Sequence, residues 1–259
     1  MIRAGTNVFH RDTYSINHLY SLARNAAGID RRPGIYYDTI IVNIERLQKA
    51  GFVTQNIIFD VDGTLWDTTE VVAKAWNRAI QEVGLNTPVS SSILKKEFGK
   101  TMNVIADDLF SGISADQRRQ LLEKCCIYEH EAVENNTKNL LYPHVRETLK
   151  ELSEKCRLFI VSNCQSGYIE LFMKKVGVEK YITDIECYGN TGKGKGDNIR
   201  LLIERNHLKD AAYVGDTQGD REATAEAGIP FVFARYGFGS VEDYAFVIDD
   251  FGELLNFDN

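Results

Sequence analysis

Residues 56–68 of the chain read NIIFDVDGTLWDT. The apolar residues 57–59 form the short hydrophobic run that a strand buried in a parallel sheet requires. Asp60 and Asp62 follow, and Gly63 then permits a turn. Residues two apart in a strand share a face, and ligands of α/β proteins bind beside the carboxyl ends of parallel strands. The stretch therefore predicts a buried strand that presents two carboxylates to a ligand.

From residue 142 onward the sequence alternates between short β-type runs and helical patterns. Such alternation is typical of a parallel sheet with helices on both faces, so we predict an α/β fold, a three-layer Rossmann-like parallel sheet. The expected strands are 157–161, 182–187, 212–215, 231–233 and 246–248, and the expected helices are 145–154, 169–176, 198–206 and 220–227.

Two segments do not follow this alternation. Residues 69–141 have helical spacing and no β-branched runs, which predicts an all-helical insert. Residues 1–52 contain helical patterns but no motif that indicates a chemical task. We therefore expect an N-terminal extension of unassigned role at 1–52, a core domain at 53–68 and 142–259, and a helical domain at 69–141.

Composition limits the class of protein. The chain has 259 residues, of which 44% are hydrophobic and 26% charged, as in ordinary globular proteins. A formal charge of −7 argues against a general nucleic-acid or membrane-surface binder. No apolar run approaches the ~20 residues of a membrane span, and the first residues lack the apolar core of a secretory signal. Five cysteines without metal-ligand spacing indicate reduced thiols, so we expect a cytoplasmic protein.

Polar side chains also follow two other predicted strands. Ser162 and Asn163 come after one strand, and Asp216 and Asp220 come after another. Acids that gather at one edge of a sheet repel one another unless a cation binds, and hard oxygen ligands suit Mg²⁺. A flexible basic loop, residues 191–196, lies between the two groups in the sequence. A cation, a lysine and a hydroxyl together predict a site for a phosphoryl group.

These residues carry a resemblance to a known family. The run Asp-Val-Asp-Gly-Thr-Leu at 60–65 resembles the first motif of the haloacid dehalogenase superfamily, and Ser162 after an apolar strand resembles the second. A lysine at 193 or 195 resembles the third motif, and Gly-Asp-Thr-Gln-Gly-Asp at 215–220 the fourth. The helical insert is similar to the cap of the phosphoglycolate phosphatase-like and β-phosphoglucomutase-like branch. The likeness spans about residues 54–255 and leaves the first fifty unexplained.

The resemblance implies catalytic and metal-binding roles. Asp60 would attack phosphorus and form an aspartyl-phosphate, and Asp62 would act as acid and then as base. Mg²⁺ would be bound by Asp60, the backbone carbonyl of Asp62, and Asp216. Asp220 would bind the metal through water or orient the other ligands.

The resemblance also implies a substrate-binding set. Ser162 would donate a hydrogen bond to a phosphoryl oxygen, Asn163 would add its backbone amide, and Gly63 and Thr64 would border the substrate. The lysine is left between two candidates. Lys195 stands at the start of a predicted helix and fits the family better than a lysine two positions earlier. No proline follows it, unlike in many relatives, so the register of the loop stays open.

The predicted function is a Mg²⁺-dependent phosphatase that acts on a small phosphorylated metabolite. The alternatives are a phosphomutase of the β-phosphoglucomutase kind, which uses the same residues, and a regulator that binds phosphate without turnover. A dehalogenase is disfavoured because that branch has no use for Asp62 or for a metal. We expect no nucleic-acid or membrane partner, and either a monomer or a homodimer.

Overall fold

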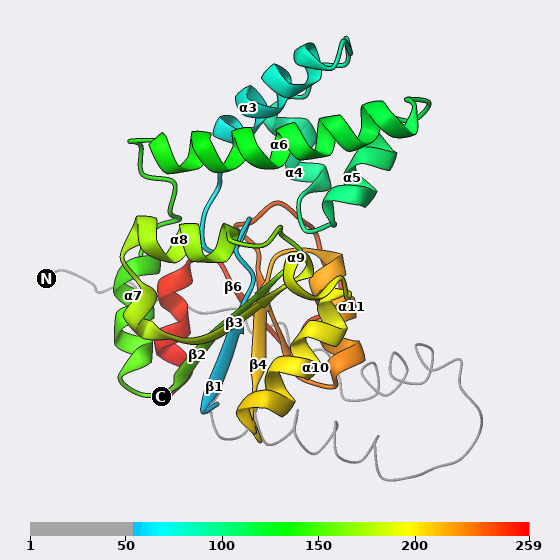
Figure 1. Cartoon of the computed structure of the whole chain (residues 1–259). Coiled ribbons are helices and arrows are strands. Elements are labelled where there is room, and N and C mark those ends of the chain that lie inside the picture. The colour runs from blue at the N-terminus through cyan, green and yellow to red at the C-terminus, as the bar shows by residue number, and fades with distance from the viewer. Residues whose placement is uncertain (1–53, 259) are drawn as a thin grey trace, which may run out of the picture. The chain divides into compact units, whose positions relative to one another are not determined.

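The computed structural model describes residues 54–258, so the extension predicted at 1–52 lies outside the described residues. Its core is a six-stranded parallel sheet with the strand order β3-β2-β1-β4-β5-β6 (Figure 1). The predicted parallel sheet is therefore confirmed, and each strand lies within about a residue of its predicted place. The strands are β1 (Asn56–Phe59), β2 (Arg157–Ser162), β3 (Ile182–Cys187), β4 (Ala212–Gly215), β5 (Phe231–Ala234) and β6 (Phe246–Ile248).

Strand β1 lies in the middle of the sheet, between β2 and β4, and all four of its residues are buried. Alternate side chains of the strand enter different cores. Ile57 and Phe59 belong to one hydrophobic cluster, and Ile58 belongs to the other. The apolar run thus serves two layers at once, which is why it does not alternate between apolar and polar residues.

Helices cover both faces of the sheet, as predicted (Figure 1). The first core contains residues of α7 (Val145–Ser153), α8 (Tyr168–Val176) and the 3-10 helix η2 (Phe251–Asp258). The second contains residues of α10 (Lys195–Asn206) and α11 (Gln218–Ala227). The short helices η1 (Glu179–Tyr181) and α9 (Tyr188–Thr191) flank β3.

Two helices of the core begin earlier than their apolar spacing predicts. Helix α10 begins at Lys195 rather than at residue 198, because Gly194 is in an extended conformation and acts as its N-cap. Helix α11 begins at Gln218 rather than at residue 220, because Thr217 caps it in a capping box with Asp220. Both starts place a charged side chain in the first turn of a helix, at the carboxyl end of the sheet.

Between residues 69 and 141, all of which the structure describes, the regular elements are helices, as predicted. Helices α3 and α6 pack against each other, and α4 and α5 lie beside them (Figure 1). Before α3, Asp67 accepts hydrogen bonds from the amide and from the hydroxyl of Thr69. The helices are α3 (Thr69–Glu82), α4 (Ser91–Glu97), α5 (Met102–Leu109) and α6 (Ala115–Asn135).

The two linkers that join this helical insert to the core run side by side. The amide of Asp67 donates to the carbonyl of Leu140 at 2.9 Å, and the amide of Tyr142 donates to the carbonyl of Leu65 at 3.1 Å. The insert therefore leaves the core and returns to it at one place.

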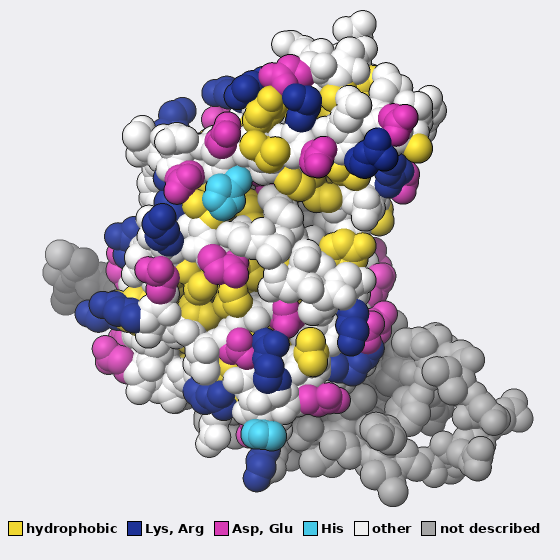
Figure 2. Space-filling model, in the orientation of Figure 1, with side chains coloured by type: hydrophobic (Ala, Val, Ile, Leu, Met, Phe, Trp, Pro, Cys, Tyr) yellow, Lys and Arg dark blue, Asp and Glu magenta, His cyan; other side chains and the backbone are white. Residues whose placement is uncertain are grey.

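On the face shown in Figure 2, acidic and basic side chains are interspersed. Within residues 54–258, no helix combines the length and the hydrophobicity of a membrane span.

Candidate active site

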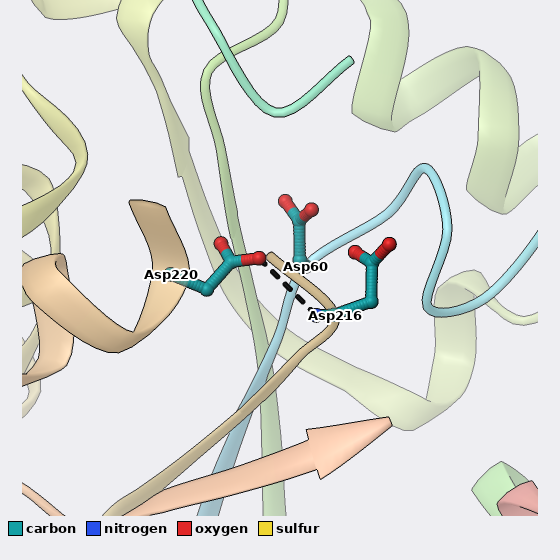
Figure 3. A group of neighbouring side chains, drawn as sticks. All are labelled: Asp60, Asp216 and Asp220. Carbon is teal, nitrogen blue, oxygen red and sulfur yellow. Dashed lines mark hydrogen bonds between the residues drawn. The ribbon is translucent and has the colours of Figure 1, made fainter. Parts of the chain in front are cut away.

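Three carboxylates meet at the carboxyl edge of the sheet. Asp60 follows β1, Asp216 follows β4, and Asp220 lies in the first turn of α11. Each offers an oxygen within 4.8 Å of the others, and all three side chains are buried. Figure 3 shows them side by side, with the hydrogen bond from the Asp216 amide to Asp220 drawn as a dashed line. The structure thus brings together the acids that the sequence placed after two different strands.

A buried lysine lies between two of these acids. The ammonium of Lys195 is 2.9 Å from Asp60 Oδ1 and 2.5 Å from Asp220 Oδ1. Burial lowers the pKa of this ammonium, but the charges of Asp220 and Asp60 outweigh burial and hold the pKa above its usual value. Lys193 is exposed. Of the two candidate lysines, the structure therefore places Lys195 at the acids.

Asp220 is held by a dense set of donors. Its Oδ2 accepts hydrogen bonds from the amide of Asp216 at 3.2 Å, the amide of Thr217 at 2.9 Å and the hydroxyl of Thr217 at 2.7 Å. Its Oδ1 accepts from Lys195 and, at 3.4 Å, from the hydroxyl of Tyr213. A carboxylate with both oxygens engaged is suited to orient its neighbours, which is one of the two roles predicted for it.

Asp216 is enclosed by backbone. Its Oδ2 accepts a hydrogen bond from the amide of Phe238 at 2.7 Å. Gly63 has φ +84°, and a Cβ there would lie 2.2 Å from the same oxygen, so the position requires glycine. The hydroxyl of Thr64 donates to Asp216 Oδ1 at 3.4 Å. Gly63 and Thr64, predicted to border the substrate, thus lie against this acid.

Burial and mutual repulsion oppose the simultaneous ionisation of Asp60 and Asp216. Burial raises the pKa of Asp60 to about 6, against the opposing charge of Lys195. Burial, with the charges of Asp220 and Asp60, raises the pKa of Asp216 well above its usual value. Because one ammonium faces three carboxylates, two negative charges lack a partner in this cluster, and a divalent cation would supply that charge.

Asp62 is held by residues that come from outside its own motif. Its Oδ1 accepts hydrogen bonds from the hydroxyl of Tyr168 at 2.9 Å and from the hydroxyl of Thr68 at 3.0 Å. Burial raises the pKa of Asp62 to about 8, and the charges of Glu129 and Asp60 add to the effect. A carboxyl group with this pKa still holds its proton at neutral pH, as a general acid must.

Ser162 is the last residue of β2, and Asn163 follows it. Ser162 is buried. The side-chain amide of Asn163 donates to the carbonyl of Gly99, in the loop between α4 and α5, at 2.8 Å. Its Oδ1 is buried and has no hydrogen-bond partner among residues 54–258. A Cβ on Gly99 would lie 3.1 Å from the side chain of Thr217, so this loop of the insert rests on the core.

Glu129 is the functional candidate that the sequence reasoning missed most clearly. It is buried on α6, where its carboxylate accepts hydrogen bonds from the indole of Trp76 at 2.8 Å and from the amide of Gln165 at 3.0 Å. Burial raises its pKa. Glu129 follows Cys125 by one helical turn and precedes Val133 by another, and both of these are buried. An acid within an apolar stripe is the signal that would have identified it.

Trp66 follows the turn that carries Asp62 and Gly63. The structure places it in the core, where its ring contacts Phe172 and Tyr168. Its indole nitrogen is buried and without a hydrogen-bond partner among the described residues.

The sequence is similar to that of known hydrolases over the part of the chain that contains these acids. Residues 57–234 match the family model described as haloacid dehalogenase-like hydrolase. A phosphoglycolate phosphatase of Vibrio parahaemolyticus is 29% identical over 215 residues, which make up 77% of this chain and 93% of that protein.

Solved structures give the same picture for the fold. A predicted phosphoglycolate phosphatase from Haemophilus somnus has a TM-score of 0.69 at 23% identity, over 80% of this chain and 98% of that one. CbbY from Rhodobacter sphaeroides, solved in complex with phosphate, has a TM-score of 0.67 at 18% identity, over 78% of this chain and 96% of that one. At these identities the likeness shows a shared fold.

Proposed function

Because this chain belongs to the haloacid dehalogenase-like hydrolase family, we propose that its buried acid cluster removes the phosphoryl group from a small phosphorylated metabolite in two steps. The chain is a phosphoric monoester hydrolase, and its relatives named phosphoglycolate phosphatase make 2-phosphoglycolate the first substrate to test. One observation carries the proposal. Asp60 and Asp62 are two residues apart after β1, and their surroundings raise the pKa of Asp60 to about 6 and that of Asp62 to about 8.

Asp60 is the proposed nucleophile. Its carboxylate oxygen would attack phosphorus, the bond from phosphorus to the leaving oxygen would break, and an aspartyl-phosphate would form. Asp62 would give its proton to the leaving oxygen. In the second step Asp62 would take a proton from water, the water oxygen would attack phosphorus, and inorganic phosphate and free Asp60 would result.

The cluster fits a divalent metal ion, and we propose Mg²⁺. Three carboxylates with oxygens within 4.8 Å, facing one ammonium, are hard ligands with uncompensated negative charge. Asp60, Asp216 and the backbone carbonyl of Asp62 would hold the ion, while Asp220 holds Lys195 and the amide of residue 216 in place. When bound, the ion would supply positive charge against the nucleophile and the phosphoryl oxygens.

The phosphoryl group would be bound by Ser162, Asn163 and Lys195. Ser162 is the last residue of β2, the strand next to β1. The Lys195 ammonium lies 2.9 Å from the proposed nucleophile, Asp60. Each group offers a donor to an oxygen on which charge develops, which is the arrangement that stabilises phosphoryl transfer.

We further propose that helices α3–α6 form a cap that opens to admit substrate and closes for the reaction. The hydrogen bonds that join the insert to the core include one from Asn163 to the carbonyl of Gly99 and one from Gln165 to Glu129. Both would have to break for the cap to open. Closure would exclude bulk water from the acids during phosphoryl transfer.

The test is phosphate release from p-nitrophenyl phosphate, 2-phosphoglycolate and a panel of sugar phosphates, with Mg²⁺ or with EDTA. We expect release that needs Mg²⁺ and that is lost in Asp60→Asn. Asp197→Asn is the matched control, because Asp197 is exposed in the first turn of α10 and forms an ion pair with Arg200 at the surface.

Rapid quenching with a labelled substrate tests the intermediate itself. Label bound to protein and released by hydroxylamine indicates an acyl phosphate on a carboxylate. Turnover by Asp60→Asn at the rate of the unmodified chain would contradict the proposed nucleophile. Absence of release across the panel, followed by phosphoryl exchange when a sugar bisphosphate is added, would instead identify a phosphomutase.

A further inference from the structure

A buried pair of side chains joins the helical insert to the core. Glu129 lies on α6 of the insert, where it is 4% exposed. Its Oε1 accepts a hydrogen bond at 3.0 Å from the side-chain amide of Gln165, which lies in the core between β2 and α8. Its Oε2 accepts a hydrogen bond at 2.8 Å from the indole of Trp76 on α3. One carboxyl group therefore ties two helices of the insert to the chain that follows β2.

The buried carboxyl group of Glu129 is costly if its only role is packing. Glu129 lies between Cys125 and Val133 in the buried stripe of α6, and both of these hydrogen-bond donors are neutral groups. Removing a carboxyl group from water costs free energy that neutral donors offset only in part, whereas an apolar side chain would fill the same stripe without that cost. Packing alone therefore does not account for an acid at this position.

Gln165 belongs to the turn that leads into α8. Its carbonyl accepts a hydrogen bond from the amide of Tyr168 at 3.3 Å, and Gly167, with φ +85°, is the N-cap of the helix. The turn is packed closely against the chain after β3, because a Cβ on Gly189 would lie 2.0 Å from the amide nitrogen of Ser166. The turn is thus fitted to the core by its backbone, and the side chain of Gln165 ties it to the insert.

Tyr168, at the other end of this turn, holds the proposed general acid. Its hydroxyl donates to Asp62 Oδ1 at 2.9 Å, and the hydroxyl of Thr68 donates to the same oxygen at 3.0 Å. Among the described residues, the side-chain hydrogen bonds of Asp62 thus go to one oxygen, which leaves the other for proton transfer. Tyr168 is 1% exposed and its ring packs edge to face against Trp66, so the side chain has little freedom of its own. A shift of the turn would therefore move the hydroxyl relative to Asp62.

We propose that Glu129 and Gln165 are positioning residues for the general acid. When the insert docks on the core, the hydrogen bond between them fixes the turn at residues 165–168, and the turn places the Tyr168 hydroxyl against Asp62. Protonation of the leaving oxygen is then efficient only while the insert is docked and bulk water is excluded. This effect on turnover rests on the proposed function, whereas the contact between insert and core does not.

The test compares two substrates that differ in how much their leaving group needs a proton. Gln165→Met nearly keeps the length of the side chain but removes the donor to Glu129. We expect its kcat to fall about tenfold on the best alkyl phosphate of the panel and less than about twofold on p-nitrophenyl phosphate, whose leaving group needs little protonation. Glu129→Leu, which removes the acceptor, should show the same difference between the substrates. Equal losses on both substrates would overturn the proposal, because loss of structure alone does not distinguish leaving groups.

Lys175→Met is the matched control for loss of a contact between insert and core. Lys175 also lies on α8, and its ammonium donates to the carbonyls of Glu134 at 2.9 Å and Asn136 at 2.7 Å, at the end of α6. This contact does not lead to Asp62, so the substitution should change kcat by the same factor on both substrates. If Lys175→Met lowered turnover of the alkyl phosphate selectively, any loosening of the insert would have that effect and the role assigned to Gln165 would be wrong.

A double variant tests whether Gln165 acts through Tyr168. If it does, Gln165→Met combined with Tyr168→Phe should lose about tenfold in kcat on the alkyl phosphate, as Tyr168→Phe alone does. A loss of about a hundredfold, the product of two independent effects, would contradict the proposed route.

Urea unfolding in EDTA tests the contact without turnover. The effects of Glu129→Leu and Gln165→Met on the free energy of unfolding should be non-additive in the double variant, because each removes the same hydrogen bond. Additive effects would show that the pair does not dock the insert. If the chain released no phosphate from any substrate, the proposed function would fail while this coupling still reported on the contact, so the two failures are distinguishable.

Discussion

Replacing Lys195 by methionine tests the charge balance of the acid cluster. Methionine keeps the length and the apolar stem of lysine but removes the ammonium that lies 2.9 Å from Asp60 and 2.5 Å from Asp220. Lys195 is 5% exposed and the two acids are 1% and 0% exposed, so water cannot replace the lost cation. Removing one partner from a buried ion pair costs about 3–5 kcal/mol, and here a single substitution removes the partner of two acids.

The assay is unfolding by urea in EDTA at neutral pH, for the unmodified chain, Lys195→Met and Lys193→Met. We expect Lys195→Met to lose about 3–5 kcal/mol of unfolding free energy. Lys193 is exposed, and its substitution should change stability by less than about 0.5 kcal/mol. Adding Mg²⁺ should stabilise Lys195→Met more than the unmodified chain, because the ion then meets three acids without a competing ammonium.

Two outcomes would refute this reasoning. One is a Lys195→Met protein that unfolds in EDTA within about 1 kcal/mol of the unmodified chain, since the acids would then not depend on the ammonium. The other is an equal response of both proteins to Mg²⁺, which would show that the ion does not bind where the ammonium acts.

Three further predictions concern neighbours of the cluster. In Tyr168→Phe, which removes a donor to Asp62, kcat should fall about tenfold on an alkyl phosphate and less than about twofold on p-nitrophenyl phosphate, whose leaving group needs little protonation. Equal losses on both substrates would mean that the hydroxyl does not act through Asp62. For Glu129→Gln, the sign follows from the raised pKa of Glu129, because the folded chain binds this proton more tightly than the unfolded chain does. The contribution of Glu129 to stability is therefore lost as the pH rises from the usual pKa of a glutamate to the raised pKa of the folded chain. Urea unfolding in EDTA from pH 5 to pH 8 should therefore show a steeper decline in the unmodified chain than in Glu129→Gln, and parallel curves would contradict the assignment. Gly63→Ala should lose about 1–3 kcal/mol and respond less to Mg²⁺ in the same assay, because φ is +84° and the added Cβ meets Asp216; unchanged unfolding would show that the turn can relax.

The sequence predicted the sheet and the acids at its edge for a definite reason. Asp60 and Asp216 directly follow apolar runs that have few alternatives to being buried parallel strands, and parallel strands end at one edge. The position of each acid was therefore fixed by its own neighbours in the chain. The choice between the two lysines needed the structure, because it depended on where α10 begins, and Gly194 set that start three residues before the apolar spacing did.

The partners of Asp62 could not be found in the same way. Tyr168 reaches it from α8, 106 residues away, and no local pattern links the two positions. The hydrogen bond from Gln165 to Glu129 likewise joins the chain after β2 to α6, 36 residues earlier in the sequence. What sequence reasoning missed is thus a set of contacts made by packing between distant elements.

The paired linkers at residues 65–67 and 140–142 make the helical insert exchangeable. Because the two ends of the insert are tied to each other by backbone hydrogen bonds, the chain passes between core and insert at one short ladder. A transplanted insert from a relative must match that ladder and the hydrogen bonds that Asn163, Gln165 and Lys175 make with the insert. Recombination at this junction would exchange the insert, while the acids, the lysine and the sheet are inherited unchanged.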